Sequence, residues 1–400
     1  MNRTAYINGL LVRADRIEPG VLITTGDRIT SIGDAPLPGD TIVDLRGRYL
    51  TPGFVEIHVH GGGGADFMDL STEAFRTVCR THAKHGTTSL TPTSTVADTA
   101  DYATFLQLCR DFREKDTGGA RVIGAHHYGP YFYPPARGCH PKLDYLTPSV
   151  KDADVFAGFG PGFPCSVTIA PELPHAQEMT RACVEKGIIV NLGHSHGTFE
   201  QVEAAMGWGA THVDHLFCAM SDRARLRIAQ PFPMRGGLLE ATLSFQQLTT
   251  EVIADGHHLA DSLLRTAYLV KGPDRLALVT DSMRAVDCPD GEYWFGPKDR
   301  GELIRRRGNV GVTLDGTGLA SGVLGLDDCV RVMANATKAP LYEVIRMATL
   351  TPARIIGLQN DIGSLQVGKR ADLLVMSPEL QVEDVVIGGK SMQLATTGHH

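Results

Sequence analysis

Thr51-Pro-Gly-Phe-Val-Glu-Ile-His-Val-His60, followed at once by four glycines at 61–64, is the stretch that decides the fold. Residues 54–60 make an apolar run of strand length that ends in two histidines. Side chains two apart on a strand point to the same side, so His58 and His60 are expected to project together. Neutral imidazoles are common ligands of zinc and similar ions, and glycines allow a sharp turn beside them. A single His-x-His is also common on protein surfaces, so the rest of the chain must decide between the two interpretations.

The bulk properties exclude several classes of protein. The 400 residues can bury one large domain and a smaller one, and 42% hydrophobic with 21% charged residues is ordinary for a soluble globular protein. A net charge of -7 gives no overall basic field, which argues against general nucleic-acid binding. The eight cysteines contain no C-x-x-C pair, which fits a reducing compartment rather than a disulfide framework or a thiolate metal site.

Targeting and membrane segments are not expected either. The first residues lack the apolar core of a signal peptide, and no apolar run reaches about 18 residues. We therefore predict a cytoplasmic protein without a membrane partner. The final Gly398-His-His400 has the character of a purification-tag remnant and is left out of the fold argument.

The two ends of the chain are both rich in β-branched runs. In residues 1–51 such runs alternate with turns, and Asn8-Gly9 and Gly26-Asp27 are typical of hairpins. Residues 363–389 have the same character. We predict one small β-sandwich domain assembled from residues 1–51 and 356–397.

The middle of the chain, residues 52–355, has a different rhythm in which apolar runs alternate with amphipathic stretches of helix length. After 54–60, the expected strands are 88–93, 122–126, 166–170, 188–194, 211–217, 251–255 and 276–281. The expected helices include 72–85, 100–114, 175–185, 198–208 and 260–270. About eight such units predict a (β/α)8 TIM-like barrel as the catalytic domain. A doubly wound open sheet is the competing architecture, but no G-x-G-x-x-G follows an early strand.

Histidines and acids recur where the expected strands end. The carboxyl ends of barrel strands converge on one rim, and several buried polar groups meeting there are hard to explain as packing. We therefore expect a metal site drawn from these residues: His58, His60, His126, His194, His215, Asp255 and Asp281. Four other histidines are expected to have ordinary roles: His196 exposed on a turn, His212 structural, and His82 and His85 on a helix face.

The chain resembles the amidohydrolase superfamily and, within it, the N-acetylglucosamine-6-phosphate deacetylase family. The resemblance runs from Pro52-Gly53 and the His-x-His to Gly368-Lys-Arg-Ala-Asp-Leu373, nearly the whole chain. The more specific matches, in the family's order, are Gly129-Pro-Tyr-Phe132, Gly138-Cys-His-Pro141, Ala170-Pro-Glu172, Gly193-His-Ser195, His215-Leu-Phe-Cys-Ala-Met220, Ile253-Ala-Asp-Gly-His-His258, Leu278-Val-Thr-Asp281 and Gly318-Leu-Ala320. Ancestry alone does not prove the substrate.

The resemblance implies a role for each matching residue. It makes His194 and His215 metal ligands, with His58 and His60 completing the set, and Asp281 the catalytic acid and base. The substrate-binding residues that it implies are His140 for the sugar and, for the phosphate, Arg235, His258 and the main chain around Cys218 and Ala219. It further implies a divalent metal, one Zn2+ with Fe2+ as the alternative, and a homodimer in which a neighbouring subunit can complete the sugar pocket.

Two residues depart from the family pattern. Tyr128 stands where the family has a metal-binding glutamate, and Cys218 where it has an asparagine. The first change predicts a single ion on His58, His60 and His194, with Asp281 as a further candidate and His215 either bound or placed against its water. Tyr128 is then expected to line the site as a hydrogen-bond donor, a candidate for oxyanion stabilisation. An additional stretch, residues 221–230 with three arginines, is expected to be a solvated loop, with extra anion contacts as the alternative.

The resemblance thus implies a metal-dependent amidohydrolase that removes the acetyl group from an N-acetylated amino-sugar phosphate such as N-acetylglucosamine 6-phosphate. A related amidohydrolase, such as an N-acyl amino acid hydrolase or a deaminase, is the first alternative, marked by the Tyr128 and Cys218 changes. A non-catalytic relative that binds a sugar phosphate is the second.

Overall fold

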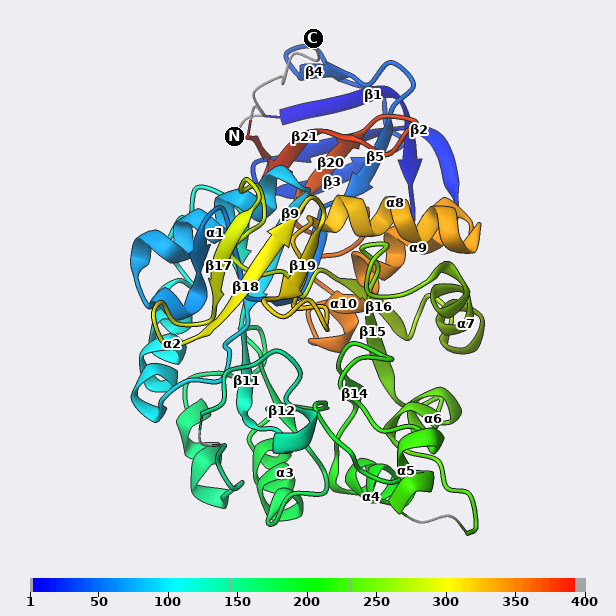
Figure 1. Ribbon diagram of the computed structural model, residues 1–400. Coiled ribbons are helices and arrows are strands. Elements are labelled where there is room, and N and C mark those ends of the chain that lie inside the picture. Colours follow the sequence, from blue (N-terminus) through cyan, green and yellow to red (C-terminus); the bar gives the residue numbers. More distant parts are fainter. Residues whose placement is uncertain (1–2, 144, 230–231, 393–400) are drawn as a thin grey trace.

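The computed structural model describes residues 3–143, 145–229 and 232–392. Its middle is a barrel of parallel strands, which confirms the predicted (β/α)8 fold (Figure 1). Two sheets make the wall, in the orders β10-β9-β6 and β11-β12-β13-β14-β15-β16. The wall strands are β6 (Phe54–Val59), β9 (Thr87–Pro92), β10 (Arg121–Val122), β11 (Ala125–Tyr131), β12 (Cys165–Ile169), β13 (Ile189–Leu192), β14 (His212–Val213), β15 (Thr249–Ile253) and β16 (Leu276–Val279).

Hydrogen bonds between the ends of the two sheets close the barrel. The Asp281 amide donates to the His58 carbonyl at 3.0 Å, and the His60 amide donates to the Ser282 carbonyl at 2.9 Å. On the opposite side Thr93 and His126 form a parallel bridge. β10 and β11 share one position of the wall, because β10 pairs with β9 and β11 with β12. The carboxyl ends of the strands therefore meet at one rim, as the barrel topology requires.

Helices cover the outside of the barrel, and the five predicted ones are present with ends within three residues of those expected. Their ends follow from local chemistry. Ser71 caps the first turn of α1, Thr198 and Gln201 form a capping box on α4, and Gly209 ends α4 with φ 113°. The helices are α1 (Thr72–Lys84), α2 (Thr99–Asp111), α3 (Ala176–Glu185), α4 (Phe199–Trp208), α5 (Arg223–Ala229), α6 (Leu238–Ser244), α7 (Asp261–Lys271), α8 (Leu326–Thr337), α9 (Leu341–Met347) and α10 (Leu350–Ile355), with 3-10 turns η1 (Phe67–Asp69), η2 (Pro134–Ala136) and η3 (Val150–Phe156).

The two ends of the chain form one small β-sandwich domain at the end of the barrel, as Figure 1 shows. The C-terminal strand β20 pairs antiparallel with β5 from the N-terminal part, Leu374 opposite Thr51. The strands are β1 (Arg3–Val12), β2 (Ile17–Thr25), β3 (Arg28–Ile32), β4 (Thr41–Asp44), β5 (Tyr49–Pro52), β20 (Leu373–Met376), β21 (Val382–Ile387) and β22 (Lys390–Ser391). The exact division at residues 51/52 and 355/356 stays a prediction. Residues 393–397, assigned to this domain, and the final 398–400 lie outside the described residues.

An antiparallel sheet after β16 was not predicted. It consists of β17 (Gly291–Phe295), β18 (Glu302–Arg307) and β19 (Val310–Thr313). The buried Arg284 ties this sheet to the barrel, because its guanidinium pairs with Asp69 and donates to the Trp294 and Gly296 carbonyls. A small hairpin of β7 (Gly61–Gly62) and β8 (Ala65–Asp66) follows the His-x-His.

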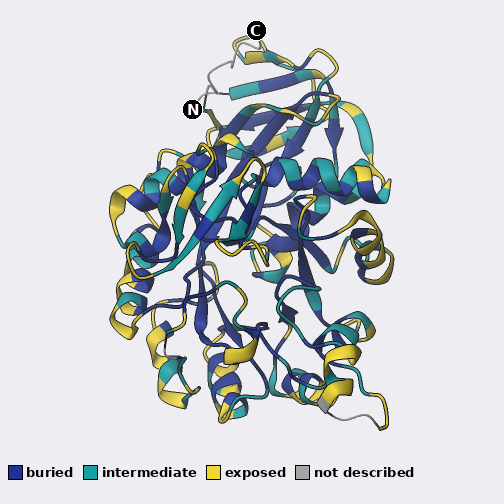
Figure 2. Ribbon diagram, viewed as in Figure 1, coloured by how far each residue is buried: buried dark blue, intermediate teal, exposed yellow. Residues whose placement is uncertain are grey.

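The barrel strands are buried along nearly their whole length, whereas exposed residues lie on the outer helices and loops (Figure 2). Within the described ranges, no helix has both the length and the apolar character that a bilayer crossing needs.

Candidate metal-dependent active site

The histidines that the sequence singled out converge at the rim. His58 and His60 come from the end of β6, His194 follows β13, His215 follows β14, and Asp281 follows β16. The four histidines are at most 4% exposed. His194 and Asp281 have left-handed backbones, with φ 45° and 44°. Non-glycine residues in this region are strained and gather at functional sites, so both side chains are held in place by the surrounding fold.

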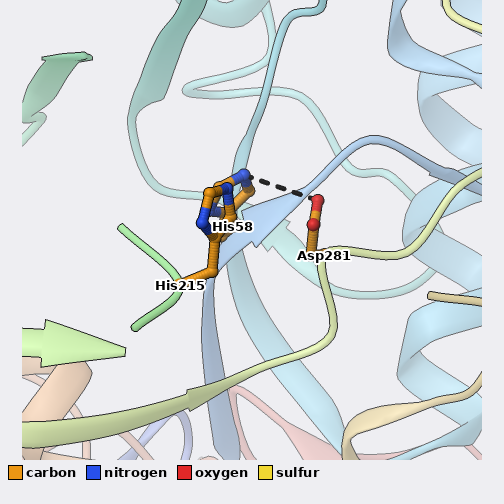
Figure 3. A group of neighbouring side chains, drawn as sticks. All are labelled: His58, His215 and Asp281. Carbon is orange, nitrogen blue, oxygen red and sulfur yellow. Dashed lines mark ion pairs between the residues drawn. The ribbon is translucent and has the colours of Figure 1, made fainter. Parts of the chain in front are cut away.

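One flank of the site is formed by His58, His60 and Asp281. Asp281 Oδ1 lies 3.0 Å from His60 Nε2 and 3.5 Å from His58 Nε2. On its other side, His58 Nδ1 is hydrogen bonded to the buried Glu251 carboxylate. Figure 3 shows the group of His58, His215 and Asp281, with the ion pair between His58 and Asp281 dashed. The carboxylate on Nδ1 orients the ring so that Nε2 faces into the site.

The other flank is formed by Tyr128, His194 and His215. The Tyr128 hydroxyl lies 2.5 Å from His194 Nε2 and 2.7 Å from His215 Nε2. His194 Nδ1 lies 2.8 Å from the Ala136 carbonyl oxygen. The structure thus places the residue that departs from the family pattern between two of the four predicted ligands.

Aromatic rings surround these residues. His140, the predicted sugar-site histidine, has its ring centre 5.0 Å from that of His194 and 5.3 Å from that of Tyr128. Phe132 stacks on His194 at 4.0 Å, and Phe295 of β17 packs at 5.0 Å against both His60 and His140. The unpredicted sheet therefore contributes one wall of the site.

A layer of buried polar groups lies beneath these residues. Asp214 accepts hydrogen bonds from Thr168 at 2.6 Å and from Asn191 at 2.8 Å, and Thr168 Oγ1 also lies 2.9 Å from His126 Nε2. His126 thus sits below the site. His212 bridges Glu251 and Thr249, in keeping with the structural role expected for it.

The pKa shifts follow from burial and from this network. Burial opposes ionisation of Asp281, but His58 and His60 outweigh it and hold the carboxyl pKa below its usual range. Burial lowers the pKa of His194 and raises that of Tyr128, so the ring is neutral and the phenol protonated. Burial also disfavours protonated His58, yet Glu251 and Asp281 raise its pKa to about 10. His58 therefore lies between two carboxylates, those of Glu251 and Asp281.

The donor set fits a divalent metal ion. One ligand atom each of His58, His215 and Asp281 lies within 4.8 Å of the others. His58 Nε2, His60 Nδ1 and His215 Nδ1 are buried, and the described residues offer them no hydrogen-bond partner. Imidazole nitrogens with a carboxylate are the usual ligands of catalytic zinc. A further cluster, His85 with Asp327 and Asp328, lies outside the site and is tied up in ion pairs with Asp287 and Arg331.

The predicted phosphate-binding residues lie in different settings. His258 Nδ1 pairs with Asp255 at 2.7 Å; burial opposes its protonation, but Asp255 raises its pKa. Arg235 Nη1 pairs with Glu200 of α4 at 3.0 Å and is 34% exposed. The Cys218 amide donates to the His215 carbonyl at 2.9 Å, and Ala219 has a left-handed backbone, φ 50°.

Several expectations about other residues need correction or completion. His196 is half-buried rather than exposed, since it packs on Tyr133, and His82 is fully buried, with Nε2 2.9 Å from the Gly61 carbonyl oxygen. The arginines of the additional stretch, Arg223, Arg225 and Arg227, are exposed on α5, which fits a solvated segment; Gln230 and Pro231 lie outside the described residues. Sequence reasoning missed Glu251, Asp214 and Phe295. An acid within an apolar strand, as at Glu251, was the available signal.

Comparison with known proteins agrees with this geometry. The amidohydrolase family model matches residues 49–392. N-acetylgalactosamine-6-phosphate deacetylase of Escherichia coli O157:H7 is 31% identical over 89% of this chain and 90% of its own length. N-acetylglucosamine-6-phosphate deacetylase of Bacillus subtilis is 32% identical over 83% of this chain and 82% of its own. A crystal structure of a Mycobacterium smegmatis N-acetyl-D-glucosamine-6-phosphate deacetylase variant in complex with that sugar phosphate is 27% identical, covers 98% of this chain and 100% of its own, and has a TM-score of 0.87.

Proposed function

Because the chain belongs to the amidohydrolase family, we propose that this hydrolase removes the acetyl group from an N-acetylated amino-sugar phosphate. The observation that carries the proposal is the meeting of His58, His60 and Asp281 at the rim of a barrel whose relatives are deacetylases of two such sugars. N-acetylglucosamine 6-phosphate and its galactosamine epimer are both candidate substrates.

The proposed chemistry needs one proton carrier. Asp281 is ionised and reaches the site, so its carboxylate can accept a proton from the attacking water and return it to the leaving amine nitrogen. The water adds hydroxide to the acyl carbon, the C–N bond breaks, and acetate and a free amine result. A bound divalent ion would supply water acidification and carbonyl polarisation. Tyr128 is a neutral phenol that lines the site between His194 and His215.

The ligands proposed to hold the ion are drawn from His58, His60, His194 and His215, with Asp281 beside them. Zn2+ is the proposed metal and Fe2+ the alternative, because imidazole nitrogen with carboxylate suits both. Burial supports the proposal, since His58 Nε2, His60 Nδ1 and His215 Nδ1 have no hydrogen-bond partner among the described residues.

For the phosphate we propose Arg235 and His258, with main-chain groups around Cys218 and Ala219, and for the sugar His140. Arginine suits phosphate through its planar fork, and His258 is biased toward the charged form by Asp255. A phosphate would compete with Glu200 for Arg235. We further propose that the protein forms a homodimer and is located in the cytoplasm.

Acetate release from N-acetylglucosamine 6-phosphate, N-acetylgalactosamine 6-phosphate and unphosphorylated N-acetylglucosamine tests the proposal. We expect one phosphorylated sugar to be turned over with a kcat/KM at least about 100-fold above that of the unphosphorylated sugar, because charge-assisted contacts to phosphate are lost otherwise. Asp281→Asn should lower kcat by about 100-fold or more. Zinc content, measured in the same preparation, separates loss of proton transfer from loss of the ion.

The Tyr128 and Cys218 changes favour a second candidate, a related amidohydrolase with another acylated substrate or a deaminase. That candidate would be established if the zinc-loaded protein hydrolysed N-acyl amino acids but released acetate from none of the three sugars. A protein that binds the sugar phosphates but hydrolyses nothing would be a non-catalytic relative.

A further inference from the structure

A single hydroxyl lies between two of the four predicted ligand histidines. Tyr128 contacts the Nε2 atoms of both His194 and His215, at 2.5 and 2.7 Å. The Nε2 atoms of His58 and His60 instead face the Asp281 carboxylate. The four histidines therefore divide into two pairs, one facing a phenol and the other facing a carboxylate.

The direction of each hydrogen bond follows from the remaining ring nitrogen of His194. Its Nδ1 lies 2.8 Å from the Ala136 carbonyl oxygen, which can only accept, so Nδ1 carries the proton and Nε2 is an acceptor. Tyr128 must then donate its one proton to His194. Its oxygen is left to accept from His215 Nε2, which therefore carries a proton. The phenol oxygen thus occupies the position between the two Nε2 atoms that a cation bound by both rings would take.

The phenol is fixed in this position. Tyr128 is 1% exposed, its amide donates to Ser94 Oγ, and Ser94 Oγ donates to the Tyr128 carbonyl, both at 2.8 Å. Its ring packs edge-on against His58 and Phe132, with ring centres 4.6 and 4.7 Å away. The next residue, Gly129, has φ 118°, and a Cβ there would lie 2.6 Å from the Val96 nitrogen. The backbone beside Tyr128 is therefore packed closely against Val96.

We infer that the Tyr128 hydroxyl takes the place of a second cation as the partner of His194 and His215, so that the chain binds one divalent ion, on the His58 and His60 flank. His194 and His215 are then hydrogen-bonding residues that position Tyr128 rather than ligands through Nε2. The ligands among the four candidate histidines are then His58 and His60. The inference rests on the proposed metal dependence, but it concerns the number and position of ions and not turnover.

Zinc stoichiometry tests the inference without an activity measurement. The full chain is stripped with a chelator, reloaded with excess Zn2+, desalted and analysed by elemental mass spectrometry. We expect one zinc per chain in the wild type, and one in His194→Asn, because His194 is not a ligand. His58→Asn should lose the zinc. Tyr128→Glu should gain a second zinc, because a carboxylate beside two imidazoles completes a three-ligand site.

Tyr128→Phe is the matched control, since it keeps the ring and adds no carboxylate, and it should retain one zinc. Two zinc ions in the wild type, or loss of zinc in His194→Asn, would overturn the inference. A folded Tyr128→Glu protein that binds only one zinc ion would also overturn the inference. If the glutamate variant does not fold, Co2+ loading decides: the visible spectrum of His194→Asn should match that of the wild type, and a changed spectrum would make His194 a ligand. The zinc counts do not depend on acetate release. The single-ion inference and the proposed deacetylase function can therefore be refuted independently.

Discussion

Glu251→Gln tests how the fold prepares the metal-binding flank. Glu251 is 1% exposed and belongs to β15; its carboxylate accepts from His58 Nδ1 and lies 3.3 Å from His212 Nε2. Glutamine keeps the shape of the side chain and an acceptor oxygen, but it replaces a charge-assisted hydrogen bond with a neutral one. The substitution therefore acts on His58 without removing it.

The size of the effect can be worked out in two ways. Losing a carboxylate that orients a ligand histidine typically weakens metal binding by about 10- to 100-fold, equal to about 1.4–2.8 kcal/mol. Hydrogen bonds to charged groups contribute about 1.5–3 kcal/mol and neutral ones about 0.5–1.5, a difference of about 1–1.5 kcal/mol. The two ranges meet at about 1.4–1.5 kcal/mol, so we expect zinc affinity to fall by about tenfold.

Competition with a chromophoric zinc chelator measures this change at constant pH. Glu203→Gln, at an exposed position on α4, is the matched control and should leave affinity unchanged. Equal zinc affinities for the wild type and a folded Glu251→Gln protein would refute the reasoning, because Glu251 would then not support His58 as a ligand.

Three further substitutions test other parts of the structure. His85→Gln should lower the free energy of unfolding by about 2 kcal/mol at about pH 6 and by much less at about pH 10. Burial opposes protonation of His85, but Asp287 and Asp327 outweigh it and raise the pKa to about 10, so the stabilisation is complete below about pH 6.5 and is lost as pH rises through about 10. Equal losses at both pH values in urea titrations would contradict this. Arg284→Met should lower the free energy of unfolding by about 3 kcal/mol, because it leaves Asp69 and the carbonyls of Trp294 and Gly296 without their partner. A Tm shift under about 2 °C would count against the role of Arg284. Arg235→Ala should raise KM for the phosphorylated substrate by about tenfold or more and leave the unphosphorylated sugar unaffected, and equal changes in both would remove Arg235 from phosphate binding.

The barrel could be predicted because its signals are local. Strand-length apolar runs alternate with helices whose ends carry their own caps, such as Ser71 and Thr198, and the polar residues fall at strand ends where parallel topology gathers them. The assembly of both termini into one domain could also be predicted, because both ends of the chain carry β-branched runs separated by turns. These features depend on residues close in the sequence, or on the barrel topology, which brings the carboxyl ends of all strands to one rim.

The parts that could not be predicted depend on contacts between distant residues. The β17–β19 sheet is anchored by Arg284, whose partners include Asp69, over 200 residues earlier in the chain, and its strands mix arginines with aromatic residues rather than alternating cleanly. The placement of Tyr128 between two histidines likewise requires three strands in register. Glu251 was visible as an acid in a strand, but its partner His58 was not.

The pairing of β20 with β5 has a consequence for the nascent chain. Residues 49–52 leave the ribosome about 320 residues before their partner strand, so the edge of β5 that β20 covers stays open while the whole barrel is made. An open strand edge is a template for other chains. A protein truncated before Leu373 should therefore self-associate even with its active site complete, because the strand that covers this edge is made only after the whole barrel.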